Sequence, residues 1–225
     1  MVVQVTRTPT AISSHRDYWE VFYAGAGRAE VPQEPSAFAR WCGDQLRPGS
    51  WVVEIGCGTA RDSLWLAARG HQVIGYDYSE AALAHATATA GRFGTPVDFR
   101  MLDLYDRPAV LAEARALAGS ADELTVYARF LLHAVEDDGQ RNVLDFAATA
   151  LAGGGRFFAE FRTSRDRGRQ HVFGEHFRSY PDPDLVTREI EATGGRVVDH
   201  QEGHGLAPYR DEDPYVCRLV ATWTA

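Results

Sequence analysis

The sequence predicts an α/β fold in which one mostly parallel sheet is covered by helices on both faces. Segments with strand character and segments with helical periodicity alternate along most of the chain, which is typical of such a sheet. The last two strand segments have no helix between them, which predicts an antiparallel end to the sheet. The length of 225 residues and the hydrophobic content of 45% suit one large domain with a sizeable core.

Two helices are expected before the first strand. The first carries four aromatic residues on one helical stripe, Tyr18, Trp19, Phe22 and Tyr23. The second starts near Pro35-Ser36 and is stopped by Pro48-Gly49. We therefore expect an N-terminal helical segment or lid over residues 1–34, with its first dozen or so residues loose, and a single domain over residues 35–225.

The domain is expected to contain seven strands. They cover residues 51–55, 72–76, 97–101, 123–128, 156–161, 196–202 and 215–224. Four of the helices between them are expected over residues 61–69, 109–117, 140–151 and 184–193. A fifth is expected in the 80s, with Ser79 as its cap.

Charge and composition exclude several function classes. A formal net charge of −8 argues against a general binder of nucleic acid or of anionic membranes, because both require a basic surface. No apolar run approaches the roughly 20 residues of a membrane span, and the N-terminus lacks the apolar region of a signal peptide. The three cysteines are widely spaced, which indicates a reduced, cytoplasmic protein. No Cys/His cluster has zinc-site spacing, so no metal is expected.

A glycine-rich turn, Glu54-Ile55-Gly56-Cys57-Gly58-Thr59-Ala60, ends the first strand. Ligands of open α/β sheets bind outside the carboxyl ends of the strands, and two glycines let a ligand approach the backbone closely. A dinucleotide fingerprint would need glycine at position 61, where this chain has Arg61. Taken alone, the turn is equally consistent with an ordinary turn.

This turn resembles the first motif of the class I S-adenosylmethionine-dependent methyltransferases, E/D-x-G-x-G-x-G. Glu54, Gly56 and Gly58 match it, and Ala60 stands where the family has its last glycine. The resemblance is strong over roughly residues 35–161 and moderate elsewhere. It implies a Rossmann-like sheet, the cofactor S-adenosyl-L-methionine and methyl transfer, with Glu54 helping to organise the methionine end of the cofactor.

Two further acids follow the next two strands. Asp77 comes about 20 positions after the glycines, where a carboxylate can accept hydrogen bonds from ribose hydroxyls, or could cap a helix. Asp103 could accept a hydrogen bond from the adenine amino group, or be a solvated loop acid. In the resembled family the residue after the ribose acid, here Tyr78, packs on the adenine. The residues predicted to bind the cofactor are Tyr23, Glu54, Gly56, Cys57, Gly58, Thr59, Arg61, Asp77, Tyr78, Ser79, Asp103, Leu104 and Arg129.

A narrower resemblance covers residues 56–64, which are similar to the GCGxGRDS stretch of tellurite-resistance-type and thiopurine-type methyltransferases. Residues 127–133 and 203–209 look like an uncharacterised bacterial branch of that group. Those enzymes act on small, polarisable or polar acceptors. The resemblance therefore implies a small acceptor without naming it.

Candidates for the acceptor side follow the fourth and fifth strands. Arg129 and His133 are the predicted catalytic residues. Arg129 could hold a carboxylate of the cofactor or of the substrate, or form a salt bridge with a loop acid; His133 could be a general base near neutral pH, or be structural. The arginine-rich loop over residues 161–178 could hold an anionic acceptor or be a solvated charged loop. The residues predicted to bind substrate are Tyr18, Arg162, His176, Arg178 and Tyr209.

These observations predict an enzyme that methylates O, N or S of a small polar molecule, which would be anionic if the basic loop binds it. We expect a monomer or homodimer that binds neither nucleic acid nor membrane. A composition rich in Ala, Arg and Gly is typical of a high-GC bacterium, so the predicted function includes a role in bacterial secondary metabolism. Two alternatives stay open: a non-catalytic module that binds S-adenosylmethionine and, less favoured, an NAD-dependent oxidoreductase.

Overall fold

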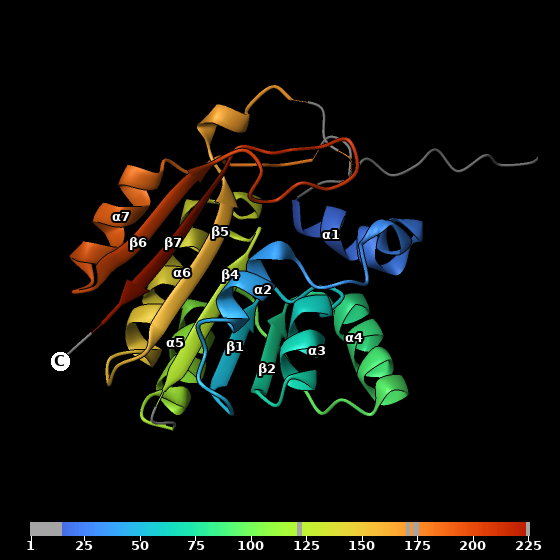
Figure 1. The fold of residues 1–225 in the computed structure, drawn as a ribbon, viewed down its shortest axis with the longest axis horizontal. Coiled ribbons are helices and arrows are strands. Elements are labelled where there is room, and N and C mark those ends of the chain that lie inside the picture. The colour runs from blue at the N-terminus through green and yellow to red at the C-terminus, as the bar shows by residue number, and fades with distance from the viewer. Residues whose placement is uncertain (1–14, 121–122, 170–171, 173–175, 224–225) are drawn as a thin grey trace, which may run out of the picture.

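The sheet has seven strands in the order β3-β2-β1-β4-β5-β7-β6 (Figure 1). It is seen in a computed structural model that describes residues 15–120, 123–169, 172 and 176–223. The strands are β1 Trp51–Ile55, β2 Gln72–Asp77, β3 Asp98–Met101, β4 Leu124–Arg129, β5 Arg156–Arg162, β6 Arg196–Gly203 and β7 Val216–Thr222. Strands β1 to β5 are parallel, and β7 is antiparallel to both of its neighbours. The predicted mostly parallel sheet with an antiparallel last strand is confirmed.

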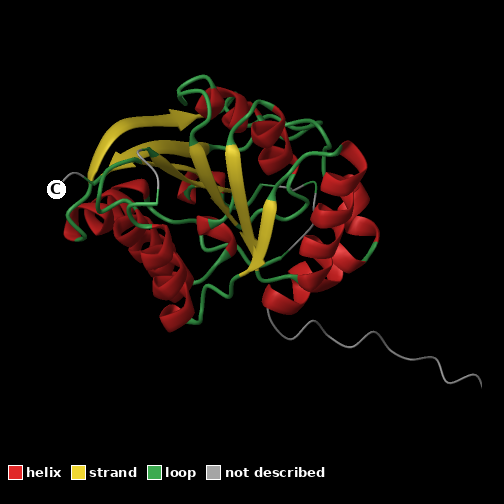
Figure 2. Cartoon of the chain, turned by 90° about the horizontal axis from the view of Figure 1, so that it is seen from below, coloured by secondary structure: helices red, strands yellow, loops and turns green. Residues whose placement is uncertain are grey.

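Helices cover both faces of this sheet (Figure 2). They are α1 His15–Ala24, α2 Ala37–Gly43, α3 Arg61–Ala68, α4 Glu80–Phe93, α5 Arg107–Leu117, α6 Asp137–Ala150 and α7 Pro183–Ala192. Three short 3₁₀ turns accompany them, Ala26–Glu30, Leu132–Ala134 and Ser164–Asp166. Helices α5, α6 and α7 contribute to the core on one face, and α2 and α3 pack on the other.

Helices α2, α4 and α5 each start directly after a capping residue. The side chains of Ser36, Ser79 and Asp106 each accept a hydrogen bond from the amide three residues further on. Helix α6 begins at Asp137, three residues earlier than the apolar periodicity predicts, because its first turn carries two acids, which the helix dipole favours there.

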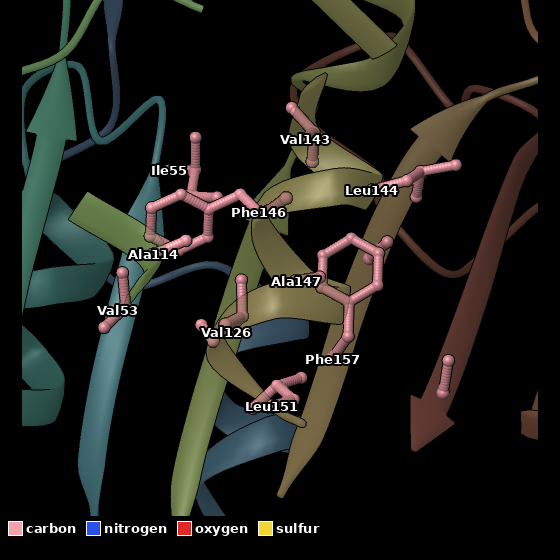
Figure 3. Close-up of a cluster of buried hydrophobic side chains, with 14 of the residues drawn as sticks. Val53, Ile55, Ala114, Val126, Val143, Leu144, Phe146, Ala147, Leu151 and Phe157 are labelled. Carbon is pink, nitrogen blue, oxygen red and sulfur yellow. The ribbon is translucent and has the colours of Figure 1, made fainter. Parts of the chain in front are cut away.

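Apolar side chains of α6 fill the main core (Figure 3). Val143, Phe146 and Ala147 face the sheet and pack in one cluster with Val53 of β1 and Phe157 of β5. Burial of each such large side chain stabilises the fold by about 1.5–3 kcal/mol.

The burial of β6 and β7 explains their order at the end of the sheet. Residues Val216–Ala221 of β7 are buried without interruption, as expected for a strand with a neighbour on each side. Residues of β6 alternate between exposed and half-buried, as expected for an edge strand with one solvated face. The later strand is therefore inserted next to β5.

Helix α1 and the segments that follow β5 and β6 lie along the carboxyl-end edge of the sheet, at the top of Figure 1. A domain boundary at residue 34 stays a prediction. Among the described residues, no helix combines the length and the hydropathy that crossing a membrane would require.

Candidate active site

A cavity of about 220 Å³ opens at the carboxyl ends of the parallel strands. Its lining comes from the segments that follow β1 to β5, from α1, and from the loop between β6 and β7. This is the edge at which open α/β sheets bind their ligands.

The glycine-rich turn after β1 forms part of this lining. Gly56, Gly58 and Ala60 have positive φ angles of 74°, 52° and 60°. Two of the three are glycines, which adopt this conformation without penalty, whereas it costs Ala60 about 1–2 kcal/mol. The amides of Gly56 and Cys57 both donate to the carbonyl oxygen of Tyr76, at 2.8 and 2.9 Å. The turn is therefore fastened to the end of β2.

Asp77 fastens the same turn through its side chain. Its carboxylate accepts hydrogen bonds from the amides of Gly58, at 2.8 Å, and Ser79, at 2.9 Å. Burial raises the pKa of Asp77, and the hydrogen bonds from these two amides oppose that rise. The cap of α4 is Ser79, whose hydroxyl accepts from the amide of Ala82 at 3.1 Å. Asp77 thus lines the cavity with its orientation already fixed.

Asp103 lines the cavity beyond β3. Its Oδ1 accepts a hydrogen bond from the amide of Tyr105 at 3.0 Å. The Tyr105 hydroxyl accepts in turn from the amide of Glu136 at 3.0 Å, and Tyr105 also lines the cavity. A carboxylate and an aromatic side chain therefore adjoin at this end.

Two buried acids lie at the turn and at the start of the helix after it. Ser63 donates its hydroxyl to Glu54. Burial, and then the nearby Asp62 carboxylate, raise the pKa of Glu54. Asp62 accepts from the amide and the hydroxyl of Ser36, both at 2.7 Å, and from the hydroxyl of Tyr127 at 2.8 Å. The Arg-Asp-Ser stretch after the turn therefore anchors both Glu54 and the start of α2.

Arg129 ends β4 and is held by a buried carboxylate. Its Nε donates to Oε1 of Glu160 at 2.9 Å, and Oε2 of Glu160 accepts from Nε of Arg218 at 2.7 Å. The salt bridge considered as an alternative role for Arg129 therefore exists, but its partner Glu160 lies on strand β5 and not in a loop. Phe130 follows with a φ of 55°, and its ring lies 4.2 Å from the guanidinium carbon of Arg129 and 5.3 Å from that of Arg162. A non-glycine residue in this conformation costs about 1–3 kcal/mol and is typical of functional sites.

His133 is buried, and one ring nitrogen is occupied. Its Nδ1 accepts a hydrogen bond from the amide of Arg162 at 3.1 Å. The neutral ring therefore carries its proton on Nε2. Burial, and then the cations Arg162 and Arg178, hold the pKa of His133 well below its usual value. This geometry favours a neutral hydrogen-bond donor and argues against the predicted general base.

Arg162 and Arg178 bring positive charge to the part of the cavity at and beyond the end of β5. Arg162 forms ion pairs with Asp166 and Glu212, both at 2.5 Å, and Asp166 also accepts from the amide of Tyr215 at 2.9 Å. Arg178 is half-buried, and burial, followed by the neighbouring Arg162 cation, lowers the pKa of Arg178. Arg162, Arg178 and Glu212 all line the cavity.

Helix α1 forms one wall of the cavity. The ring of His176 is stacked on Tyr18, with centroids 4.5 Å apart, and meets Trp19 edge-on at 4.8 Å. A Cβ built on Gly58 would lie 2.5 Å from the hydroxyl oxygen of Tyr23. The first helix therefore covers the glycine turn and packs against the segment that follows β5.

The cavity brings together most of the predicted site residues. Those that line it are Tyr23, Glu54, Gly56, Cys57, Gly58, Thr59, Arg61, Asp77, Tyr78, Asp103, Leu104, Arg129, His133, Arg162, His176, Arg178 and Tyr209. Ser79 and Tyr18 are the exceptions to the prediction: Ser79 is fully buried as a helix cap, and Tyr18 packs on His176. Residues 170, 171 and 173–175 of the predicted basic loop lie outside the described residues.

The predicted set misses several lining residues, among them Trp19, Phe22, Tyr105, Phe130 and Glu212. Trp19 and Phe22 lie on the same helical stripe as Tyr23, so the aromatic stripe could have been used to predict them as lining residues. Phe130 directly follows β4, and Tyr105 lies in the loop that follows β3, so both stand beyond strand ends, where any side chain is a candidate. Glu212 has no signal in the sequence, because only the fold brings it to Arg162.

Comparisons with known proteins agree with this architecture. Residues 52–155 match a family model described as a methyltransferase domain. The chain is similar in structure to the 1,6-didemethyltoxoflavin-N1-methyltransferase of Burkholderia thailandensis, with 21% identity, a TM-score of 0.64, and coverage of 94% of this chain and 87% of that one. It is similar to the magnesium protoporphyrin IX methyltransferase of Synechocystis with bound S-adenosylmethionine, with 17% identity, a TM-score of 0.62, and coverage of 94% and 99%.

A third similar structure is a TehB-like S-adenosylmethionine-dependent methyltransferase of Corynebacterium glutamicum, with 17% identity, a TM-score of 0.59, and coverage of 93% of this chain and 96% of that one. No curated protein matches the sequence. The structural likenesses describe the fold, and the family match covers the part of the chain that holds the glycine turn and the two strand-end acids. The part of the chain that holds the glycine turn therefore matches a methyltransferase domain, within a fold that is shared with S-adenosylmethionine-dependent methyltransferases.

Proposed function

We propose that this protein transfers the methyl group of S-adenosylmethionine to an oxygen, nitrogen or sulfur atom of a small, polar, anionic molecule. The observation that carries the proposal is the distribution of charge in one cavity. Carboxylates line it beyond β2 and β3, and guanidinium groups line it beyond β4 and β5. A nucleoside presents hydroxyl and amino donors to carboxylates, and an anionic acceptor matches guanidinium groups.

The donor side suits S-adenosylmethionine. Asp77 and Asp103 offer carboxylate oxygens to ribose hydroxyls and to the adenine amino group. Gly56 and Gly58 allow a ligand to approach the backbone, and Tyr78 offers an aromatic face. When bound, the cofactor supplies an electrophilic methyl group on a sulfonium. The task of these residues is to hold it in one orientation and exclude water.

The acceptor side suits an anion. Arg162 and Arg178 repel each other, and burial strengthens that repulsion, so an anionic group between them would be stabilised. Glu212 already neutralises part of this charge through its ion pair with Arg162. His176 and Tyr209 complete this part of the lining and offer aromatic surface for a flat molecule.

The chemistry required of the acceptor side is modest. A sulfonium methyl group is a good electrophile because a neutral thioether is its leaving group, so the protein contributes mainly alignment and the exclusion of water. His133, which carries its proton on Nε2, could orient the acceptor by donating a hydrogen bond. An acceptor that is already ionised needs no general base.

A methyl-release assay across small carboxylates, phenols and thiols tests this function. We expect turnover with anionic acceptors, and a rise of about tenfold or more in acceptor KM for Arg178→Ala with little change for Arg178→Lys. The matched control is Arg188→Ala, an exposed arginine on α7. Unchanged acceptor affinity in Arg178→Ala would remove the anion-binding role.

Calorimetric titration separates the alternatives. Binding of S-adenosylhomocysteine without turnover of any acceptor would favour a non-catalytic binding module, and binding of NAD instead would favour an oxidoreductase. The tellurite-resistance-type likeness, the place in bacterial secondary metabolism, the cytoplasmic location and the monomeric or dimeric state stay predictions from the sequence.

A further inference from the structure

Glu212 brings a carboxylate to the acceptor side of the cavity, where the arginines that are proposed to bind an anion also lie. It belongs to the loop between β6 and β7, in which the backbone amides and carbonyls of Tyr209 and Glu212 pair with each other at 2.8 and 3.0 Å. The tight turn between them contains Arg210, a non-glycine residue with a φ of 53°. Such a strained backbone is typical of functional sites. The fold therefore holds Glu212 at this point against local strain.

Both carboxylate oxygens of Glu212 are engaged. Oε1 lies 2.5 Å from Nη2 of Arg162, and Oε2 accepts a hydrogen bond from the amide of Val172 at 3.1 Å. The side chains of Arg162 and Glu212 are only 6% and 10% exposed, so water and salt screen their charges poorly. A guanidinium partner and an amide donor both stabilise the ionised carboxylate, so Glu212 places a fixed negative charge in the cavity wall.

The charged groups on this side of the cavity balance among the described residues. They are two guanidinium groups and two carboxylates, Arg162, Arg178, Asp166 and Glu212. Burial, and then the Arg162 cation, lower the pKa of Arg178, and the charge of Glu212 opposes this, so Glu212 acts on both arginines. The sulfonium of S-adenosylmethionine would add one positive charge. A single negative charge on the acceptor restores the balance, whereas a second would face the Glu212 carboxylate in poorly hydrated surroundings.

We propose that Glu212 is a specificity-determining residue that limits the acceptor to one negative charge. Monoanions such as carboxylates, phenolates and thiolates are then accepted, and dianions such as phosphate monoesters are rejected. This rests on the proposed function, because it requires an anionic acceptor beside Arg178, and it narrows the class of that acceptor. Guanidinium groups alone would favour the ligand with the larger charge, so a preference for the smaller charge is the signature of Glu212.

Two probes of the same shape test this charge limit. Phenyl sulfate carries one negative charge, and phenyl phosphate carries nearly two at a pH of about 8. The intact protein is first saturated with S-adenosylhomocysteine, which has no methyl group to transfer. In calorimetric titrations, phenyl sulfate should bind at least about threefold more tightly than phenyl phosphate. Tighter binding of phenyl phosphate would overturn the inference.

Glu212→Gln removes the charge and keeps the shape of the side chain and one hydrogen-bond acceptor. Because the Coulomb energy scales with the charge of the ligand, a gain of about threefold in phenyl sulfate affinity corresponds to a gain of about tenfold for phenyl phosphate. The preference for phenyl sulfate should therefore disappear. The matched control is Asp211→Asn, which removes the same charge from the exposed neighbouring residue and should change neither affinity by more than about twofold.

The outcomes are distinguishable. Equal changes for both probes in Glu212→Gln, or the same changes in Asp211→Asn, would overturn the inference and leave the proposed function standing. Binding of S-adenosylhomocysteine without binding of either probe would remove the anionic acceptor from the proposed function, and the charge limit with it. Circular dichroism is recorded for each variant. Should Glu212→Gln fail to fold, the order of the two probes on the unsubstituted protein still decides the question.

Discussion

Asp62 provides a sharp test of how this site is held in place. Its carboxylate accepts three hydrogen bonds, two from Ser36 and one from Tyr127, at 2.7, 2.7 and 2.8 Å. Asp62→Ala would remove all three. The two hydroxyls, 3.4 Å apart, could still pair with each other, which leaves the Ser36 amide and one hydroxyl proton without an acceptor. At about 1–3 kcal/mol for each of these two buried unsatisfied donors, we expect a loss of about 2–6 kcal/mol of unfolding free energy.

Urea unfolding followed by tryptophan fluorescence and circular dichroism measures this loss. Tyr127→Phe removes one hydroxyl and leaves the other two hydrogen bonds, so it should cost only about 1 kcal/mol. Asp44→Ala, an acid at the end of α2 whose side chain is 76% exposed, is the matched control and should change stability by less than about 0.5 kcal/mol. A cost below about 1 kcal/mol for Asp62→Ala would refute the reasoning, because the three bonds would then not be anchoring α2.

Substitutions at three further positions test individual groups. Because the pKa of Glu54 is raised, the folded state holds a proton that the unfolded state releases above pH 4.5. Ligand-free stability, measured as urea midpoints from pH 5 to 9, should therefore fall as the pH rises, and Glu54→Gln should remove this fall. The same substitution should weaken S-adenosylhomocysteine binding, which calorimetric titration measures. Because the pKa of His133 is lowered, the unfolded state binds a proton below pH 6.5 that the folded state does not bind. Stability should therefore decline as the pH falls below 6.5, by up to about 1.4 kcal/mol per pH unit. The same pH slope in His133→Gln would contradict this. Ala60→Gly relieves a left-handed conformation but frees the unfolded chain, so thermal unfolding should shift by less than about 1 kcal/mol, whereas Ala60→Val should cost more than about 2 kcal/mol.

The elements of the fold could be predicted because their signals are local. Apolar periodicity and capping residues such as Ser36 and Ser79 depend on neighbours within a few positions. The insertion of β7 between β5 and β6 depends instead on pairings across the sheet. The continuous burial of Val216–Ala221 is typical of an inner strand, and the alternating burial of β6 is typical of an edge strand.

The same division holds within the site. Glu54, Gly58 and Asp77 could be predicted to line the cavity because each stands at or just after a strand end, and the carboxyl ends of parallel strands meet at one edge of the sheet. The tautomer of His133 could not be found, since it depends on an amide of Arg162 that is 29 residues away. The conformation of Phe130 was equally inaccessible, because a positive φ at a non-glycine residue is imposed by its surroundings.

The contact between Tyr23 and Gly58 has a consequence for evolution and for engineering. A side chain at position 58 would collide first with the protein's own N-terminal helix, since its Cβ would lie 2.5 Å from the Tyr23 hydroxyl. Positions 23 and 58 are therefore expected to covary among relatives, with a larger residue at 58 accompanied by a smaller one at 23. Enlarging the site for bulkier cofactor analogues should accordingly begin by trimming Tyr23, which leaves the backbone of the turn intact.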